Sequence, residues 1–366
     1  MNIGIIGGGA CGVMCAIKLK KLNSLWNVTI LEQNDRILKK VLKTGNGKCN
    51  IANTIINKDM YNDFNLILSN QDVNVFNELK SLKIVLKETT LGRVYPYSES
   101  AKTVVNSLLR NLEKLHVDVK TNYLVQKIEF KKEVYFINND LSFDILVVAT
   151  GSIAQEVTNG YGILSNLGLG ITSLRPGLVP IITKEKTQHL QGLRIKCDAY
   201  VKGLSFSGEI LFKNDGLSGI LSLDISRIVR IGDQITLDLM PEYSYQEIKN
   251  LFINSNEDKE VVLEGIFSKM LATDLLKRSN NLDELIKNIK KFKYTVLGFK
   301  DYKEAQIVCG GVNLTEVNSN FEVKKYPNLY LGGEVLDVDG ASGGYNLYFA
   351  WLSGIVIANS IMKKYY

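Results

Sequence analysis

The stretch "NIGIIGGGACG", residues 2–12, decides the fold of this chain. Its first part is continuously apolar, which is typical of a central parallel strand that is covered on both faces. Gly7, Gly9 and Gly12 then follow in the spacing Gly-x-Gly-x-x-Gly, and a helix-compatible run begins at Ala10. In this motif the first glycine permits a tight turn, the second admits a pyrophosphate, and the third lets the helix pack against the strand. The stretch therefore predicts a dinucleotide site at a helix N-terminus.

The next strand supplies an acid at the position where such folds bind a ribose. The segment "WNVTILE", residues 26–32, alternates and is rich in β-branched residues, so it is interpreted as a strand that ends at Glu32. Glu32 follows Gly12 by about 20 residues, the spacing of the ribose-binding acid. A carboxylate at this place favours a free 2′-hydroxyl over a 2′-phosphate.

Composition and charge restrict the class of protein. A chain of 366 residues suggests two domains, and its net charge of +6 suits anionic small molecules without demanding nucleic acid. The five cysteines are odd in number and form no CxxC pair, which disfavours disulfides and zinc and fits a reducing cytoplasm. The apolar run "WLSGIVIANSIM", residues 351–362, is shorter than the ~20 residues that span a bilayer, so no membrane segment is expected.

Two later strands favour FAD as the dinucleotide. The run "ILVVATG", residues 145–151, is a buried strand that ends in Ala-Thr-Gly, and "LYLGGE", residues 329–334, ends in Gly-Glu. Both resemble marks of FAD enzymes of the glutathione-reductase superfamily, in which the late acid binds the ribityl chain. A final helix that begins near "GGYN", residues 343–346, can stabilise negative charge on the reduced flavin. No second Gly-x-Gly-x-x-Gly occurs, so NADH or NADPH would dock only transiently, or another donor would serve.

The pattern of predicted secondary structure changes in the middle third of the sequence. Short β-like segments separated by turns follow residue 179, and a charged helical pattern with at least two helices occupies residues 243–292. The chain is therefore predicted to be an α/β protein with a discontinuous FAD-binding domain, residues 1–180 and 310–366. Residues 181–309 are predicted to form an inserted β-rich and helical substrate or cap region.

Three motifs carry a resemblance to a known family. They are "GNGKCNIAN", residues 45–53, "LGRVYPYSESAKTVV", residues 91–105, and "GGEVLDVDGASGGYNL", residues 332–347. With them the chain resembles the BaiN/YhiN-like flavoproteins, which are described as NAD(P)/FAD-dependent oxidoreductases. The resemblance implies a discontinuous Rossmann-like FAD domain with an inserted β-barrel-like domain and a helical segment. It also implies reduction of an unsaturated or carbonyl-bearing hydrophobic substrate.

The chain departs from the family pattern at three positions. Lys48 stands where the family has arginine, Asn46 where it has its second glycine, and Tyr348 where glutamine is common. Lysine keeps the positive charge and loses the planar, bidentate fork of arginine. A role carried over from the glutamine is therefore not supported at Tyr348.

The candidate catalytic residues are Lys48 and Cys49. Lys48 could place positive charge near the flavin, and an equally good alternative is that it is a solvated loop lysine. Cys49 could be a redox thiol or a residue that only packs against its neighbours, and the packing role is favoured. His116 and His189 lie in no motif, which disfavours a Ser-His-Asp hydrolase. The candidate cofactor-binding residues are Gly7, Gly9, Ala10, Cys11, Gly12, Glu32, Gln33, Lys40, Gly45, Gly47, Lys48, Cys49, Asn50, Val125, Thr150, Gly151, Gly333, Glu334, Asp337, Gly344, Tyr345, Asn346 and Leu347.

The sequence leaves three functions open. The first is an FAD-dependent oxidoreductase that passes a hydride from NAD(P)H or another donor to a small organic acceptor. The second is a flavoprotein that acts on RNA, as in tRNA modification, although no basic-aromatic stripe supports a nucleic-acid partner. The third is an FAD-binding regulatory module without catalysis.

Overall fold

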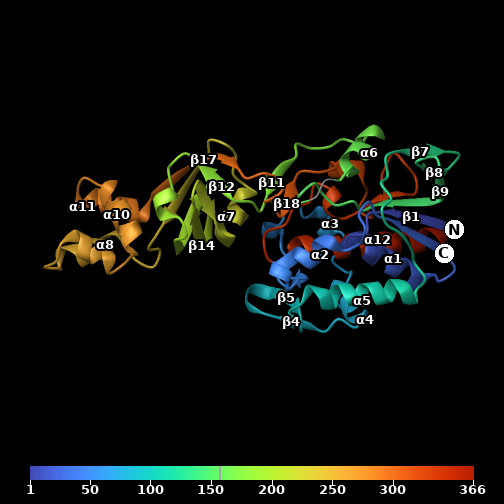
Figure 1. Ribbon diagram of the computed structural model, residues 1–366, viewed down its shortest axis with the longest axis horizontal. Helices are drawn as coiled ribbons and strands as arrows, with labels where there is room; N and C mark the ends of the chain where they lie inside the picture. The colour runs from blue at the N-terminus through green and yellow to red at the C-terminus, as the bar shows by residue number, and fades with distance from the viewer. Residues whose placement is uncertain (156–157) are drawn as a thin grey trace. The chain divides into compact units, whose positions relative to one another are not determined.

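The chain forms two compact units in a computed structural model that describes residues 1–155 and 158–366 (Figure 1). Unit 1 comprises Met1–Arg175 together with Ile307–Tyr366, and unit 2 comprises Pro176–Gln306. The insertion thus begins at Pro176 and ends at Gln306, whereas the sequence predicts residues 181–309. Each unit buries its own hydrophobic core.

A parallel five-stranded sheet organises unit 1. Its order is β19 (Leu329–Leu331), β10 (Ile145–Val148), β1 (Asn2–Ile6), β2 (Asn27–Leu31) and β6 (Asp118–Lys120). All four neighbouring pairs run parallel. The strands β1 and β10 are buried almost throughout, as their apolar runs predict. Because carboxyl ends of parallel strands share one edge, the three glycine turns that follow β1, β10 and β19 meet there.

Two helices pack closely in the core of unit 1. They are α1 (Ala10–Leu22) and α12 (Tyr345–Tyr365), and a Cβ on Gly354 of α12 would lie 2.5 Å from the carbonyl oxygen of Cys11. Glycine at this point therefore permits the close approach of the two backbones. The remaining helices of unit 1 are α2 (Lys39–Lys43), α3 (Asn65–Leu68), α4 (Val75–Ser81), α5 (Ala101–Lys114) and α6 (Gly160–Asn166).

Two small antiparallel sheets complete unit 1. In the first, β5 (Arg93–Pro96) lies between β3 (Ala52–Asn53) and β4 (Leu86–Glu88). This sheet places the end of the "GNGKCNIAN" loop beside the start of "RVYP". The second sheet consists of β7 (Ile128–Lys131), β8 (Val134–Ile137) and β9 (Leu141–Phe143). Near the limits of the two units, β11 (Arg175–Gly177) and β18 (Ile307–Cys309) form a two-stranded sheet.

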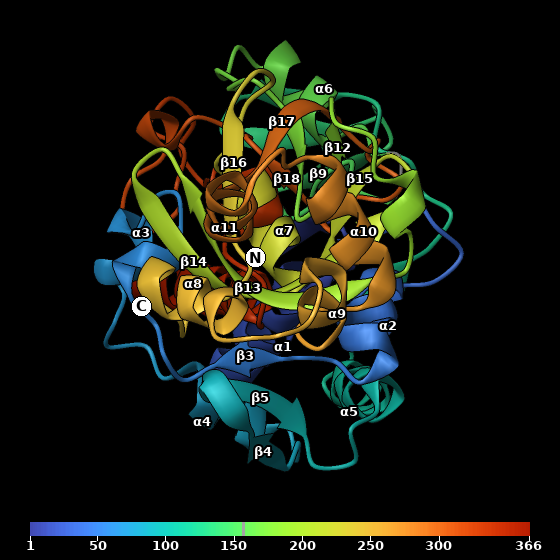
Figure 2. The ribbon, with the colours of Figure 1, turned by 90° about the vertical axis from the view of Figure 1, so that its left-hand side faces the viewer.

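Unit 2 contains a closed barrel of six strands, which can be followed in Figure 2. Around the barrel they are β12 (Ile181–Thr183), β15 (Gly216–Ser218), β14 (Leu204–Lys213), β13 (Arg194–Val201), β16 (Gln234–Asp238) and β17 (Phe292–Phe299). The helix α7 (Gly219–Ser226) follows β15. Between β16 and β17 lie α8 (Tyr245–Ile253), α9 (Lys259–Glu264), α10 (Lys269–Lys277) and α11 (Leu282–Lys290). The predicted β-barrel-like insertion with a helical segment is confirmed.

The structure also shows the burial of the cysteines and the character of the helices. All five cysteines are buried, and the described residues contain no cluster of side chains that could hold a metal ion. Among the same residues, no helix combines the length and the apolar character needed to cross a membrane.

Candidate cofactor-binding site

The turn after β1 has the geometry that its three glycines predict. Gly7 has a φ of 106°, and a Cβ there would lie 2.3 Å from the carbonyl oxygen of Ala149. A Cβ on Gly12 would lie 2.1 Å from the carbonyl oxygen of Gly7, so α1 can begin here only if both residues are glycine. By contrast, nothing lies within 4 Å of the Cβ position of Gly9, whose φ is −83°. Gly9 therefore borders open space at the N-terminus of α1, which leaves room for a phosphate.

The acid at the end of β2 braces this turn. Glu32 is only 8% exposed, and its Oε2 accepts a hydrogen bond of 2.9 Å from the backbone N–H of Gly8. Its Oε1 accepts hydrogen bonds from the backbone N–H of Asn34 at 2.9 Å and from the side-chain amide of Asn34 at 2.8 Å. The sequence motif does not reveal Gly8 and Asn34, because it leaves their positions free.

Lys40 and Glu334 bring the other two glycine turns together. The ammonium of Lys40, on α2, donates to the carbonyl oxygen of Ser152 at 2.9 Å and lies 4.0 Å from Oε2 of Glu334. Oε1 of Glu334 accepts from the backbone N–H of Val308 at 3.0 Å. Both charged groups remain partly exposed, so they can also contact a ligand. A Cβ on Gly151 would lie 3.8 Å from the Lys40 ammonium, which places the Ala-Thr-Gly turn in the same cluster.

The loop of residues 45–50 approaches the N-terminus of α12. Gly45, Asn46 and Gly47 all have positive φ angles, which form a tight, exposed turn. The Oδ1 atom of Asn50 is buried and has no hydrogen-bond partner among the described residues. It lies 2.8 Å from the Cβ position of Gly344, which precedes α12. A buried, unsatisfied oxygen costs about 1–3 kcal/mol, so a donor from a ligand is expected there.

These features fit FAD. The open space at Gly9 and the N-terminus of α1 would hold the pyrophosphate, and Glu32 would hold the ribose. Glu334 would bind the ribityl chain, and Asn50 with the start of α12 would bind the flavin ring. The orphaned oxygen of Asn50 supports this fit most directly, because only a group from outside the described residues can satisfy it.

Several other predicted site residues have side chains that contact other parts of the protein. The Cys11 thiol lies 3.4 Å from Oγ of Ser353 on α12, and burial raises its pKa to about 12, so the thiol stays protonated in the interior. The Asn346 side chain closes a loop by bonding both backbone groups of Gly340, at 2.7 and 2.8 Å. The remaining members, Ala10, Tyr345 and Leu347, lie in the first turns of α1 and α12.

Asp337 is a bracing residue and not an evident ligand. Its carboxylate accepts from Oγ1 of Thr172 at 2.8 Å and from Nδ2 of Asn62 at 3.0 Å. Its backbone N–H donates to the carbonyl oxygen of Val312. The carboxylate and the N–H of Asp337 are therefore engaged within the protein, and its contact with a cofactor stays a prediction.

Val125 and Thr150 both lie near the start of α6, whereas Gln33 follows Glu32 in the sequence. The carbonyl oxygen of Val125 accepts from Nδ2 of Asn159 at 3.4 Å. A Cβ on the adjacent Gly160 would lie 2.0 Å from Oγ1 of Thr150. Thr150 belongs to the Ala-Thr-Gly turn, so Val125 lies near that turn. Their contact with a cofactor stays a prediction.

Lys48 has an anionic partner of its own. Its side chain is 58% exposed and forms an ion pair of 2.8 Å with Glu99, which also pairs with Lys87. This carboxylate raises the pKa of Lys48, chiefly through the hydrogen bond. The structure therefore favours the alternative of a solvated loop lysine over a cation reserved for the flavin.

Cys49 lies in the core and is not poised for chemistry. Its side chain is 0% exposed, and burial raises its pKa to about 11, only partly offset by a hydrogen bond with Thr44. A thiolate is the reactive form of cysteine, and at pH 8 such a thiol is ionised in about one molecule in a thousand. The structure therefore argues against the catalytic role and supports the packing role.

The Cys49→Ser variant is expected to retain FAD and to keep its activity within about threefold, since the hydroxyl replaces a buried thiol of similar size. The pH profile of the unsubstituted protein should show no step between pH 7 and 10 that Cys49→Ser removes, because the raised pKa keeps Cys49 protonated there. Steady-state rates of both proteins across this range check the prediction. A hundredfold loss of activity with FAD still bound would restore Cys49 as a catalytic residue.

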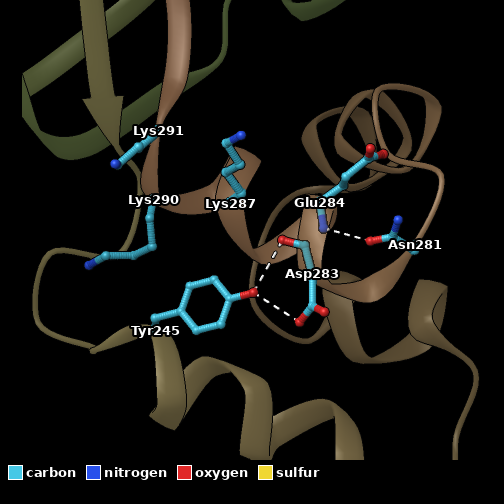
Figure 3. A pocket seen from close by; sticks show the side chains of 7 residues that line it. All are labelled: Tyr245, Asn281, Asp283, Glu284, Lys287, Lys290 and Lys291. Atoms are coloured by element: carbon cyan, nitrogen blue, oxygen red, sulfur yellow. Dashed lines mark hydrogen bonds between the residues drawn. The ribbon is translucent and has the colours of Figure 1, made fainter.

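A separate pocket of about 480 Å³ lies in unit 2, and none of the residues that line it is a predicted site residue (Figure 3). The hydroxyl of Tyr245 points at Asp283 and donates to its carboxylate at 2.9 Å. The Lys290 ammonium forms an ion pair with Oδ2 of Asp238 at 2.6 Å. The lining mixes both signs of charge: Tyr245, Asn281, Asp283, Glu284, Lys287, Lys290 and Lys291.

Known proteins are similar to this chain over nearly its whole length. The family model described as HI0933-like protein Rossmann domain matches residues 1–360. The 3-dehydro-bile acid delta(4,6)-reductase of Clostridium scindens is 28% identical, with 99% of each chain covered. The ribosomal RNA dihydrouridine synthases of Haemophilus influenzae and Escherichia coli are each 27% identical, over 98% of this chain and 98% and 97% of theirs.

Solved structures show the same fold. A 3-ketosteroid delta1-dehydrogenase from Sterolibacterium denitrificans matches with a TM-score of 0.52 and 11% identity, over 99% of both chains. The quinol fumarate reductase subunit FrdA of E. coli matches with a TM-score of 0.52 and 11% identity, over 99% of this chain and 70% of its own. At these identities the likeness concerns the fold.

Proposed function

We propose that this chain, which belongs to the HI0933-like family of Rossmann-domain proteins, is an FAD-dependent reductase of a carbon–carbon double bond conjugated to a carbonyl group. Family membership rests on the match over residues 1–360. The observations that carry the cofactor assignment are the open Gly9 turn after β1, the partly exposed Glu334 after β19, and the unsatisfied Asn50 oxygen beside Gly344. These groups suit, in turn, a pyrophosphate, a ribityl chain and a flavin ring.

The reaction type is supported by what the relatives' names have in common. A bile acid delta(4,6)-reductase and a dihydrouridine synthase both saturate a carbon–carbon double bond conjugated to a carbonyl group. Such a reduction places a hydride on the carbon remote from the carbonyl and a proton on the carbon next to it. Bound FAD, reduced beforehand, would supply the hydride. The chain's own contribution is to bind and orient the cofactor through α1, Glu32, Glu334 and α12.

For the electron source we propose NADH or NADPH. The sequence contains a single Gly-x-Gly-x-x-Gly, at Gly7 to Gly12, and FAD would occupy it. Reduced nicotinamide would therefore dock only transiently. A cytoplasmic location is part of the proposal, because an odd number of buried cysteines without a CxxC pair suits a reducing compartment.

A small conjugated ketone is the first substrate class, because the bile acid reductase covers this chain from end to end. A uridine of ribosomal RNA is the second, and one observation beyond the relatives favours it. The segment Arg36–Lys48 contains five basic residues and no acidic one, and it includes α2 and the exposed loop at the cofactor site. A basic strip at the rim of a site suits a phosphate backbone.

The decisive experiment gives the purified flavoprotein both substrate classes. We expect flavin absorption bands that NADH or NADPH bleaches without oxygen. The reduced protein is then mixed with a 3-oxo-4,6-diene bile acid, or with ribosomal RNA from cells that lack the gene. Mass spectrometry should find a gain of two hydrogens per double bond in one of them. Bands that neither donor bleaches, with no product, would favour the regulatory module, and absence of FAD after reconstitution would refute the proposal.

A further inference from the structure

We infer that Arg93 supplies the positive charge that stabilises the reduced flavin at the pyrimidine end of its ring. This inference rests on the proposed function and deepens it, because it assigns a residue to the tuning of the cofactor. The sequence suggests Lys48 for that role, but Glu99 already pairs with Lys48. Arg93 is the first residue of β5, in a different motif.

The β3–β5 pairing positions Arg93. Asn53 and Arg93 are directly opposite in this antiparallel pair, so their side chains lie on the same face. The Asn53 amide is buried and donates to the carbonyl oxygen of Gly343 at 3.0 Å. Nε of Arg93 lies 3.5 Å from the position that a Cβ would have on Gly343. The guanidinium therefore lies beside the turn that leads into α12.

Arg93 carries a charge with which no residue in the described part of the chain pairs. Among residues 1–155 and 158–366, its half-buried guanidinium takes part in no side-chain hydrogen bond and no ion pair. A guanidinium offers five donors in a planar fork, and half-buried arginines normally meet an anionic or carbonyl acceptor. The 21-residue helix α12 begins two residues after Gly343 and adds the partial positive charge of its N-terminus.

The neighbouring Asn50 supplies the complementary acceptor. Its buried Oδ1 lies 2.8 Å from the Cβ position of Gly344, next to Gly343, and awaits a donor. The pyrimidine ring of a flavin has an imide edge, in which one N–H stands between two carbonyl oxygens. Cationic donors at Arg93 and an acceptor at Asn50 match this pattern. Reduction adds negative charge to that end of the ring, so Arg93 would favour the reduced form more than the oxidised form.

Uracil has the same imide edge, so the experiment must separate cofactor from substrate. The flavin-loaded Arg93→Met variant removes the charge and keeps most of the side-chain length. Its flavin midpoint potential is expected to fall, because the reduced state loses about tenfold to hundredfold in relative stabilisation, equivalent to about 30–60 mV for a two-electron couple. Arg93→Lys should recover most of the loss. The matched control is Arg110→Met, on the exposed face of α5, which should leave the potential unchanged.

The outcomes distinguish this inference from the proposed function. A lowered potential in Arg93→Met, with FAD bound and the circular dichroism spectrum unchanged, supports the assignment. An unchanged potential with a raised KM for the accepted substrate would assign Arg93 to that substrate and overturn the inference, while the proposed function would stand. An unchanged potential and an unchanged KM would overturn it as well. A wild-type protein that binds no FAD would overturn both.

Discussion

The Gly9→Val variant is expected to fold normally and to lose FAD, with the dissociation constant raised by at least about a hundredfold. The reason is the unusual surroundings of Gly9. Its φ of −83° is open to any residue, and nothing lies within 4 Å of its Cβ position, so the protein itself has room for the larger side chain. If a pyrophosphate fills that room, the valine methyl groups and the phosphate cannot both be present.

Gly298→Val provides the control for this variant. Gly298 lies on β17 of the barrel, and its Cβ position is equally free of neighbours within 4 Å. Both variants should show the thermal unfolding midpoint of the unsubstituted apoprotein, and only Gly9→Val should fail to bind FAD in fluorescence titrations. Retention of FAD by Gly9→Val within about threefold would contradict the placement of the pyrophosphate. Loss of FAD from both variants would show that the assay reports general damage.

Trp351→Ala is expected to lower the free energy of unfolding of unit 1 by about 3–5 kcal/mol. Trp351 is 0% exposed, and its indole N–H donates to the carbonyl oxygen of Ile51 at 2.9 Å. The side chain therefore fills the core and also ties α12 to the loop that contains Cys49 and Asn50. Removing it leaves a cavity and a buried carbonyl without a donor, which has its own cost of about 1–3 kcal/mol.

Trp351→Phe separates these two contributions. The ring still fills most of the space, so we expect a loss of only about 1–3 kcal/mol, from the missing hydrogen bond. Urea titrations can follow Trp26, the other of the two tryptophans, which is buried and also belongs to unit 1. Its fluorescence therefore reports on this unit alone. If Trp351→Ala unfolds at the same urea concentration as the unsubstituted protein, the indole has no such role.

Local features of the fold follow from the sequence, because neighbours along the chain determine them. The turn at Gly7, the close packing at Gly12 and the strand that precedes Glu32 lie within one βαβ unit. In the helical part of unit 2 the sequence predicts at least two helices, and the structure has four. The capping box of Ser244 and Glu247 marks the start of α8 and could have refined that prediction.

The assignments that the sequence leaves undecided depend on partners far along the chain. The pairing of Lys48 with Glu99 and the bond from Asn62 to Asp337 both join separate motifs. No spacing rule predicts them, because each requires the loops to be placed in space first. The same holds for Arg93, whose position beside Gly343 depends on the pairing of β3 with β5. Sequence motifs therefore indicate the cofactor, whereas the electrostatics around it require the tertiary structure.

The interrupted course of unit 1 has a consequence for protein synthesis. A ribosome completes all of unit 2, residues 176–306, before it reaches β19 and α12. Until then β10 lacks one of its two neighbours in the sheet, and α1 lacks the helix that packs at Cys11. Translation adds about 5–20 residues per second, so the nascent chain spends about 10–40 s between the end of β10 and the start of α12 in this half-built state. The barrel of unit 2 can therefore be folded while unit 1 still lacks β19 and α12.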